Sequence, residues 1–178
     1  HKGSQILCAC SGGLDSTALT VLTARYGSKL GELRGILHFN HGWRGKESDH
    51  DQHFVEELGE QLGLPVLVGR GESPKKGASP EVQARAARKV FFRESLSRFP
   101  EGTKILTGHH QDDLAETILW RVMTGGARTH GMGILVSEGD ELRSALTTTK
   151  AELQTFLQEE GVSWREDRTN FEGKLLRS

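Results

Sequence analysis

The sequence predicts an α/β fold in which helices cover both faces of a mainly parallel five-stranded sheet, giving three αβα layers. Short apolar segments of strand length alternate with longer segments of helical periodicity, which is typical of βαβ units. Glycine, serine or proline separates these segments and supplies the turns between them. A length of 178 residues fits a single domain with a core of its own.

The first half of the chain contains three expected strands and three expected helices. The strands fall at residues 5–10, 33–39 and 65–69, and the helices run from Asp15, from Ser48 or Asp49 to Leu62, and from Pro80 to about Phe99. Gly63 follows the second helix and Pro80 opens the third, the places where glycine and proline are favoured. In the third helix, Val82, Ala86 and Val90 recur every four residues, which predicts that they form its inward face.

The second half contains fewer clear elements. We expect a fourth strand at residues 103–107, a helix at about 111–123 and a glycine-rich loop at 125–133. Thr149 and Glu152 form a capping box that opens a last helix, which ends at Gly161. Because the alternation stops after about Leu135, we expect residues 1–135 to form the main domain and residues 136–178 an extension of it.

Composition excludes several classes of protein. The 23 Lys and Arg residues balance 24 Asp and Glu residues, so the chain is not basic throughout. No run of about 18 apolar residues occurs, which predicts no spanning helix and no membrane partner, and the first residues do not resemble a signal peptide. The two cysteines, Cys8 and Cys10, lie too close together to crosslink the fold. Two thiols without a disulfide framework favour a reducing, cytoplasmic location.

Charge is unevenly distributed despite the balanced total. Residues 47–60 carry six acidic side chains, whereas residues 81–98 carry five basic and two acidic ones. Arg85 and Arg88 are three residues apart and share a face of the helix expected there. A solvated helix face is the simplest explanation, and neutralisation of a nucleotide or an RNA backbone is the alternative.

The segment 11–16, Ser-Gly-Gly-Leu-Asp-Ser, lies between an expected strand and an expected helix. Two glycines allow a tight turn whose N–H groups approach a ligand, and the start of a helix attracts anions. The serine hydroxyls add donors, so a phosphate or pyrophosphate fits this place. Asp15 fits it too if a Mg²⁺ ion lies between the carboxylate and the phosphates. A plain strand-to-helix turn is the alternative.

A second polar segment, 107–117, follows the fourth expected strand and reads Thr-Gly-His-His-Gln-Asp-Asp-Leu-Ala-Glu-Thr. Ligands of open α/β sheets gather at the carboxyl ends of the strands, where segment 11–16 also falls. Asp113 and Glu116 share a helix face. Carboxylates favour a hard ion over zinc, so we expect Asp15 and Asp113 to bind Mg²⁺ together. Ordinary first-turn acids and packed histidines are the alternative.

These motifs resemble those of the N-type ATP pyrophosphatases and, within them, the tRNA(Ile)-lysidine synthases. Segment 11–16 matches the family signature S-G-G-x-D-S, and segment 109–117 matches the family's second motif. Residues 40–44, 81–88 and 164–170 resemble the family's D-H-G-L-R, E-x-x-A-R-x-x-R and W-R-E-D-x-T-N stretches. Asn40 stands where the family has Asp, and Trp43 where it has Leu. The resemblance covers nearly the whole chain.

The resemblance implies a Rossmann-like (adenine nucleotide alpha hydrolase-like) fold and an ATP-binding catalytic domain over residues 1–135. It implies an ATP- and Mg²⁺-dependent ligase that adenylates a cytidine of the tRNA anticodon loop with release of pyrophosphate, and then joins lysine to it with release of AMP. The expected partners are therefore tRNA(Ile) with a CAU anticodon and L-lysine. We consider a homodimer as the assembly, and we expect this chain to lack the additional tRNA-binding domains of many members.

The resemblance also implies roles for individual residues. The ATP site would comprise Ser11, Gly12, Gly13, Asp15, Ser16, His38, His41, Gly108 and His109, with Asp15 and Asp113 binding Mg²⁺. Arg85 and Arg88 would join the two aspartates in catalysis, and Arg44, Glu116, Arg121 and Arg165 would bind substrate. Two alternatives stay open: a tRNA thiolation enzyme of the same superfamily, and a nucleotide- or RNA-binding module without catalysis. Thiolation enzymes commonly use cysteine pairs, and no C-x-x-C pair occurs here.

Overall fold

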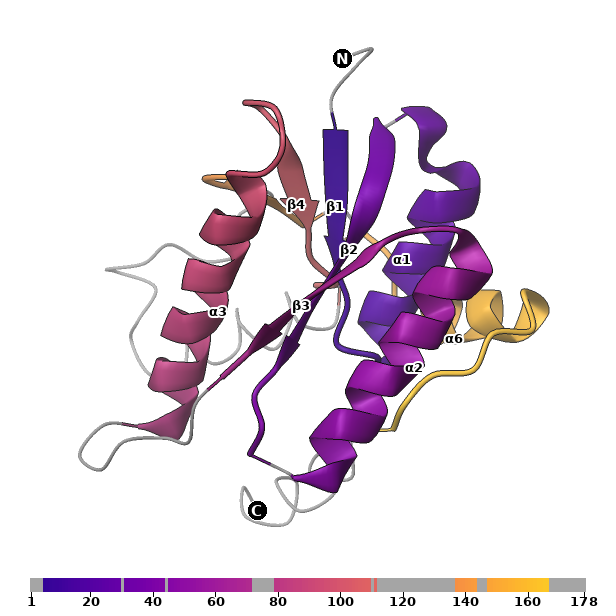
Figure 1. Cartoon of the computed structure of the whole chain (residues 1–178). Helices are drawn as coiled ribbons and strands as arrows, with labels where there is room; N and C mark the ends of the chain where they lie inside the picture. Colours follow the sequence, from indigo (N-terminus) through magenta and orange to yellow (C-terminus); the bar gives the residue numbers. More distant parts are fainter. Residues whose placement is uncertain are drawn as a thin grey trace, which may run out of the picture.

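The structure, a computed structural model, is built around one sheet with the strand order β3-β2-β1-β4-β6-β5 (Figure 1). It describes residues 5–29, 31–43, 45–71, 79–109, 111, 137–143 and 147–166. The strands are β1 (Gln5–Ala9), β2 (Glu32–Asn40), β3 (Val66–Arg70), β4 (Lys104–Leu106), β5 (Ser137–Glu138) and β6 (Glu141–Leu142). The helices are α1 (Leu14–Tyr26), α2 (Lys46–Leu62), α3 (Pro80–Leu96) and α6 (Lys150–Glu159), with a 3₁₀ turn at Gly27–Lys29.

The sheet of the described residues is mainly parallel, as expected. β1 pairs with β2 and β4 on its two sides, and β3 and β6 extend the parallel order outward. β5 pairs antiparallel with β6 and makes a sixth strand at the edge. Two-residue strands are too short to show an apolar pattern, so β5 and β6 are additions to the strands read from the sequence. The central position of β1 puts the turn after it beside the ends of β2 and β4.

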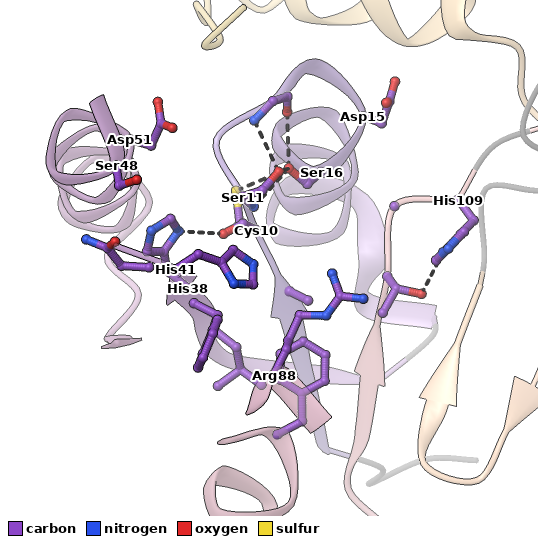
Figure 2. A pocket seen from close by; sticks show the side chains of 18 of the residues that line it. Cys10, Ser11, Asp15, Ser16, His38, His41, Ser48, Asp51, Arg88 and His109 are labelled. Atoms are coloured by element: carbon purple, nitrogen blue, oxygen red, sulfur yellow. Dashed lines mark hydrogen bonds between the residues drawn. The ribbon is translucent and has the colours of Figure 1, made fainter. Parts of the chain in front are cut away.

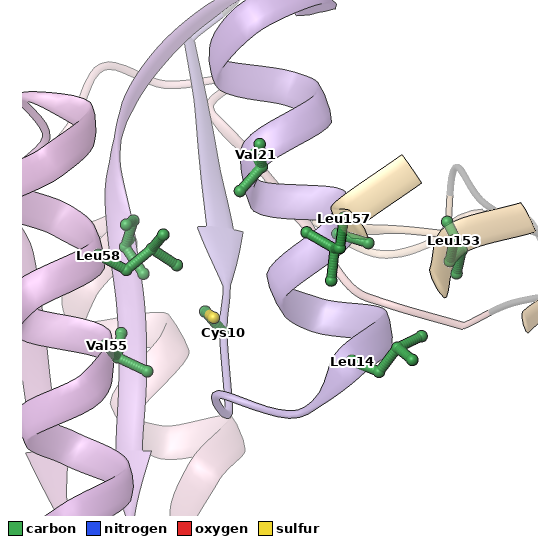
Figure 3. Packing of buried hydrophobic residues seen from close by; sticks show 9 residues of the cluster. Cys10, Leu14, Val21, Val55, Leu58, Leu153 and Leu157 are labelled. Atoms are coloured by element: carbon green, nitrogen blue, oxygen red, sulfur yellow. The ribbon is translucent and has the colours of Figure 1, made fainter. Parts of the chain in front are cut away.

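Helices cover both faces of the sheet, with α1, α2 and α6 on one side and α3 on the other (Figure 1). On the first face, Cys10 and Ile36 pack against α1, α2 and α6 in a cluster that includes Val21, Val55, Leu58 and Leu157 (Figure 3). On the second face, Leu7, Leu37 and Ile105 pack against Phe92 of α3. Neighbouring strand residues thus point to opposite helical layers, which confirms the three-layer αβα architecture.

Several helix boundaries confirm the expected start and stop signals. Gly63 ends α2 with a φ of +67°, a conformation that residues with a Cβ rarely adopt. The capping box at α6 is complete, because Thr149 Oγ1 accepts from the Glu152 N–H and Glu152 Oε2 accepts from the Thr149 N–H at 2.8 Å. One expected start is wrong: α2 begins at Lys46, so Ser48 lies inside its first turn instead of capping it.

The expected inward face of α3 is also wrong. Val82 and Val90 are 65% and 50% exposed, and Ala86 is exposed with them. The helix instead packs through Phe91, Phe92 and the small buried Ser95. Phenylalanine buries more apolar area than valine, so the two adjacent rings set the rotation of the helix.

The residues beyond β4 are described in part. Past Gln111, the expected helix at 111–123 and loop at 125–133 lie outside the described residues, and the division at residue 135 stays a prediction. α6 packs against α1, so this part of the expected extension lies on the main sheet's helical layer. Within the described ranges, none of the helices combines the length and the apolar character needed to cross a membrane.

Candidate functional site

A cavity of about 560 Å³ opens at the carboxyl ends of β1, β2 and β4 (Figure 2). Its lining residues come from six parts of the chain and include Ser11, Gly13, Asp15 and Ser16 after β1; His38, Asn40 and His41 at the end of β2; Ser48 and Asp51 on α2; Arg88 and Phe92 on α3; Thr107, Gly108 and His109 after β4; and Glu141 on β6. The edge predicted for a ligand therefore carries a cavity, and most of the candidate site residues line it.

The turn after β1 is organised by one hydroxyl group. Ser16 Oγ accepts a hydrogen bond from the Ser11 N–H at 3.1 Å, lies 3.0 Å from Ser11 Oγ, and donates to the Gly13 carbonyl at 3.1 Å. Gly12 has a φ of +92°, which an L-residue with a Cβ adopts only with strain. Gly13 is the N-cap of α1, and no side chain caps the first N–H groups of this helix with a hydrogen bond. The turn therefore has the hydroxyls, N–H groups and helix dipole of an anion site.

The loop after β4 lies directly against this turn. A Cβ placed on Gly108 would be 3.0 Å from the Ser16 nitrogen and 3.1 Å from the Asp15 carbonyl carbon. Only glycine permits that approach, which brings His109 into the cavity lining with its Nδ1 3.2 Å from Thr107 Oγ1. The two motifs read separately from the sequence therefore form one site.

His38 is 3% exposed and lies at the end of β2 beside Cys10. Its Nδ1 is 2.9 Å from the Cys10 carbonyl oxygen, which only accepts, so Nδ1 carries the proton and Nε2 is an acceptor. Among the described residues Nε2 has no hydrogen-bond partner, although it is buried. Burial lowers the pKa of His38 and keeps the ring neutral. An unmatched buried acceptor in a cavity wall is available to a donor from a water molecule or a ligand.

The two candidate arginines of α3 are placed differently. Arg88 lines the cavity, with its guanidinium 6.0 Å from the centre of the Phe92 ring (Figure 2). Arg85 is exposed and does not contribute to the lining. The structure thus brings Arg88, and not Arg85, to the side of the cavity opposite the turn.

Several candidates cannot be placed. Arg44, Asp113, Glu116 and Arg121 lie outside the described residues. Asp15 lines the cavity, whereas Asp113, the other expected Mg²⁺ ligand, is one of the residues that are not described. Within the described ranges, no three His, Cys, Asp or Glu side chains gather as a metal site, and magnesium binding stays a proposal that rests on Asp15 and Asp113 together.

Arg165 lies behind the turn and is not among the residues that line the cavity. Its N–H donates to the Gly12 carbonyl at 2.8 Å, and residues 13 and 165 form a parallel β-bridge. Its Nε donates to Asp51 Oδ1 of α2 at 2.9 Å. The spacing of residues in the sequence does not indicate these contacts of Arg165, because both contact partners lie more than a hundred residues away in the chain.

Asn40 is a structural member of the site that sequence reasoning missed. It is 4% exposed, its Nδ2 donates to Asp49 Oδ1 at 3.2 Å and to Gln52 Oε1 at 3.0 Å, and its Oδ1 accepts from the Gly42 N–H at 2.8 Å. The amide thus fixes the turn that carries His41. The signal for this role in the sequence was an Asn at a position where the family has Asp. Only an amide can donate to both Asp49 and Gln52.

A second cavity, of about 380 Å³, adjoins the first between the end of β3 and α3. Phe39, His41 and Trp43 line both cavities. Their rings form a continuous aromatic wall, with centroids 4.8 Å apart for Phe39 and His41 and 5.5 Å apart for His41 and Trp43. Trp43, 37% exposed, is the solvent-exposed end of this wall.

A parallel αβα sheet with a glycine turn, a helix N-terminus and a cavity at its carboxyl edge defines a nucleotide-binding α/β protein. The family model described as the PP-loop domain matches residues 1–178, and the chain belongs to that family.

The chain is similar to curated tRNA(Ile)-lysidine synthases. It is 39% identical over 173 residues to the one from Chlorobaculum tepidum (95% of this chain, 52% of the relative). It is 35% identical to that from Persephonella marina (99% and 40%) and 37% identical to that from Thermus thermophilus (97% and 33%). The chain thus spans about half or less of the length of these relatives.

Two solved structures share the fold at low sequence identity. A U34-tRNA thiolase, NcsA, from Methanococcus maripaludis with its [4Fe-4S] cluster superposes with a TM-score of 0.72 at 15% identity, covering 93% of this chain and 60% of that one. A glutamine-dependent NAD+ synthetase from Acinetobacter baumannii in complex with ADP gives a TM-score of 0.56 at 14% identity, covering 88% and 29%. These similarities support the Rossmann-like fold expected from the sequence.

Proposed function

We propose that the chain is the catalytic part of a tRNA(Ile)-lysidine synthase-like ligase. ATP binds in the larger cavity, and the carbonyl oxygen of an anticodon-loop cytidine attacks its α-phosphorus, which expels pyrophosphate. The ε-amine of lysine then attacks the activated base and expels AMP. The similarity to tRNA(Ile)-lysidine synthases over nearly the whole chain supports this choice among PP-loop reactions.

The hydrogen-bonded turn at residues 11–16 is the observation that carries the proposal. Its serine hydroxyls and the first N–H groups of α1 would hold the β- and γ-phosphates, and the Ser16 hydroxyl, which donates to the Gly13 carbonyl in the structure, would turn to the nucleotide on binding. His38 Nε2 would accept from a donor group of the nucleoside, and Arg88 would stabilise charge developing near the α-phosphate. Mg²⁺ held by Asp15 and Asp113 would neutralise the phosphates and the departing pyrophosphate.

The aromatic wall supplies a place for the RNA. Sequence-specific RNA recognition targets unpaired bases that stack on aromatic side chains. Phe39, His41 and Trp43 separate the two cavities, so a nucleotide seated on them lies next to the site where ATP would bind. Trp43 is the exposed side chain of this wall, so it is the one that an incoming base would meet.

Thiolation is the alternative, and the cysteines argue against it. Iron–sulfur clusters are held mainly by cysteine thiolates, whereas this sequence has two cysteines, Cys8 in β1 and Cys10 just after it, 0% and 3% exposed. Burial raises the pKa of Cys8 to about 12 and also raises the pKa of Cys10, so both remain neutral thiols at physiological pH. Neither is suited to carry sulfur or to bind a cluster.

The test is transfer of labelled lysine to bulk tRNA in the presence of ATP and Mg²⁺. The proposal predicts label in the tRNA, one pyrophosphate and one AMP per lysine, and no transfer to tRNA whose CAU anticodon is changed to GAU. Ser16→Ala removes the hydroxyl that organises the turn and should lower the rate at least tenfold. Turnover of ATP with a sulfur donor and no lysine transfer would establish the thiolation alternative instead.

A further inference from the structure

Arg165 joins two parts of the proposed nucleotide site, the glycine turn and α2, without lining the cavity. Its backbone N–H holds the Gly12 carbonyl, and its side chain holds Asp51 of α2. The aliphatic stem packs on the glycine turn, since a Cβ on Gly12 would lie 3.5 Å from Arg165 Cγ. The carboxyl-terminal stretch at residue 165 thus closes the outer side of the turn.

Asp51 places a negative charge at the edge of the cavity. Its side chain is 14% exposed and belongs to the lining, on the α2 side of the view in Figure 2. A carboxylate there repels a triphosphate bound in the cavity. The guanidinium of Arg165, 42% exposed, pairs with this carboxylate at 2.9 Å from Nε to Oδ1 and so offsets its charge.

We infer that Arg165 is a positioning residue of the ATP site: through its ion pair with Asp51 it offsets that carboxylate's charge, and through its stem and N–H it braces Gly12. The sequence-based expectation was direct substrate binding by Arg165. The two roles differ in their dependence on Asp51. If Arg165 acts through Asp51, then replacing Asp51 as well should restore the ATP affinity that is lost when the guanidinium is removed. This inference rests on the proposed binding of ATP in the larger cavity.

The decisive variants keep the backbone hydrogen bond to Gly12. Arg165→Gln retains most of the stem and removes the charge, Arg165→Lys retains the charge, and Asp51→Asn removes the partner's charge. The matched control is Arg25→Ala, because Arg25 pairs with Glu160 at nearly the same exposures, 40% and 14%, between α1 and the end of α6 and outside the cavity lining. Melting temperatures without nucleotide report any general loss of stability.

The measurement is the Kd of Mg–ATP by calorimetry for each variant. We expect Arg165→Gln to weaken ATP binding roughly tenfold and the double variant Asp51→Asn/Arg165→Gln to recover to within about threefold of wild type. Arg165→Lys should stay close to wild type, and Arg25→Ala should bind ATP normally. A double variant as weak as Arg165→Gln would overturn the inference and restore direct contact, as would unchanged binding by Arg165→Gln or an equal loss in Arg25→Ala. Failure of the wild type to bind ATP would instead overturn the proposed function on which the inference rests.

Discussion

His38 on β2 and the Cys10 carbonyl that follows β1 are joined by a hydrogen bond of 2.9 Å from Nδ1 to the oxygen. The bond links the ends of two adjacent parallel strands at the cavity wall. It also fixes the tautomer of the ring, so the lone pair of Nε2 remains for a ligand. One backbone carbonyl thus decides which nitrogen of His38 is available for recognition.

This arrangement predicts a specific dependence of stability on pH. Burial holds the pKa of His38 in the folded protein below its ordinary value of 6.5. As the pH falls through about 6.5, the unfolded chain gains a proton that the folded chain resists, so the free energy of unfolding decreases. His38→Asn keeps a donor for the Cys10 carbonyl but does not titrate. The stability advantage of the wild type over this variant should therefore shrink between about pH 7 and pH 5 in urea titrations. A constant difference over that range would contradict the neutral, buried ring.

The two glycines of the turn should differ sharply on substitution. Gly12→Ala forces a side chain into a φ of +92° and places its Cβ 3.3 Å from Phe54 Cδ1, so we expect a loss of about 1–2 kcal/mol in unfolding free energy. Gly13 has a φ of −70°, and a Cβ there would meet only Ser11 Oγ, at 3.6 Å. Gly13→Ala should cost less, roughly 0.5 kcal/mol, because alanine is only a poorer N-cap than glycine there. Chemical denaturation without nucleotide compares the two, and equal losses would argue against the strained turn.

Asn40 should not be replaceable by the family's Asp at neutral pH. Asn40→Asp would bring a second carboxylate to the position that now donates to Asp49 at 3.2 Å and to Gln52 at 3.0 Å. Two lost hydrogen bonds and the like-charge contact predict a loss of about 1–3 kcal/mol in unfolding free energy at pH 7. Adding Asp49→Asn to this variant should recover part of the loss. Wild-type stability in the single variant would show that the network does not restrain the turn.

Trp43 should contribute to RNA binding and not to ATP binding. Trp43→Ala removes the exposed end of the aromatic wall, and loss of one stacked base is worth about 1–3 kcal/mol, or roughly fivefold to a hundredfold in Kd. Fluorescence titration with a fluorescent anticodon stem-loop RNA reports this Kd, and the ATP-induced rise in melting temperature reports the nucleotide site. Trp43→Phe is the control that retains an aromatic face. Equal RNA affinity in all three proteins would exclude stacking on this wall.

The sequence predicted the parts of the fold that depend on local signals. Alternating apolar segments located four strands, Gly63 and the Thr149–Glu152 box marked helix ends, and the glycine turn marked the ligand edge. The rotation of α3 about its axis could not be predicted from the sequence. Val82 and Val90 have the regular spacing of a helix face, but the larger Phe91 and Phe92 determine the packing. Local patterns do not report which of two apolar stripes is buried.

The same distinction between local signals and long-range contacts applies to the candidate site. The motifs at 11–16 and 107–109 each showed their chemistry locally, and the sheet topology brought them together. The ion pair of Asp51 with Arg165, the amide network of Asn40 and the choice of Arg88 over Arg85 depend on contacts between distant segments. No spacing in the sequence encodes those contacts, so only the folded structure reveals them.

The most direct test of ATP binding at this site is a crystal structure of the protein with Mg²⁺ and a non-hydrolysable ATP analogue. We expect the analogue in the larger cavity, with its phosphates on the turn at residues 11–16 and a donor of the nucleoside within hydrogen-bond distance of His38 Nε2. An analogue bound in the second cavity, or one whose phosphates lie away from the hydroxyls of Ser11 and Ser16, would contradict this expectation.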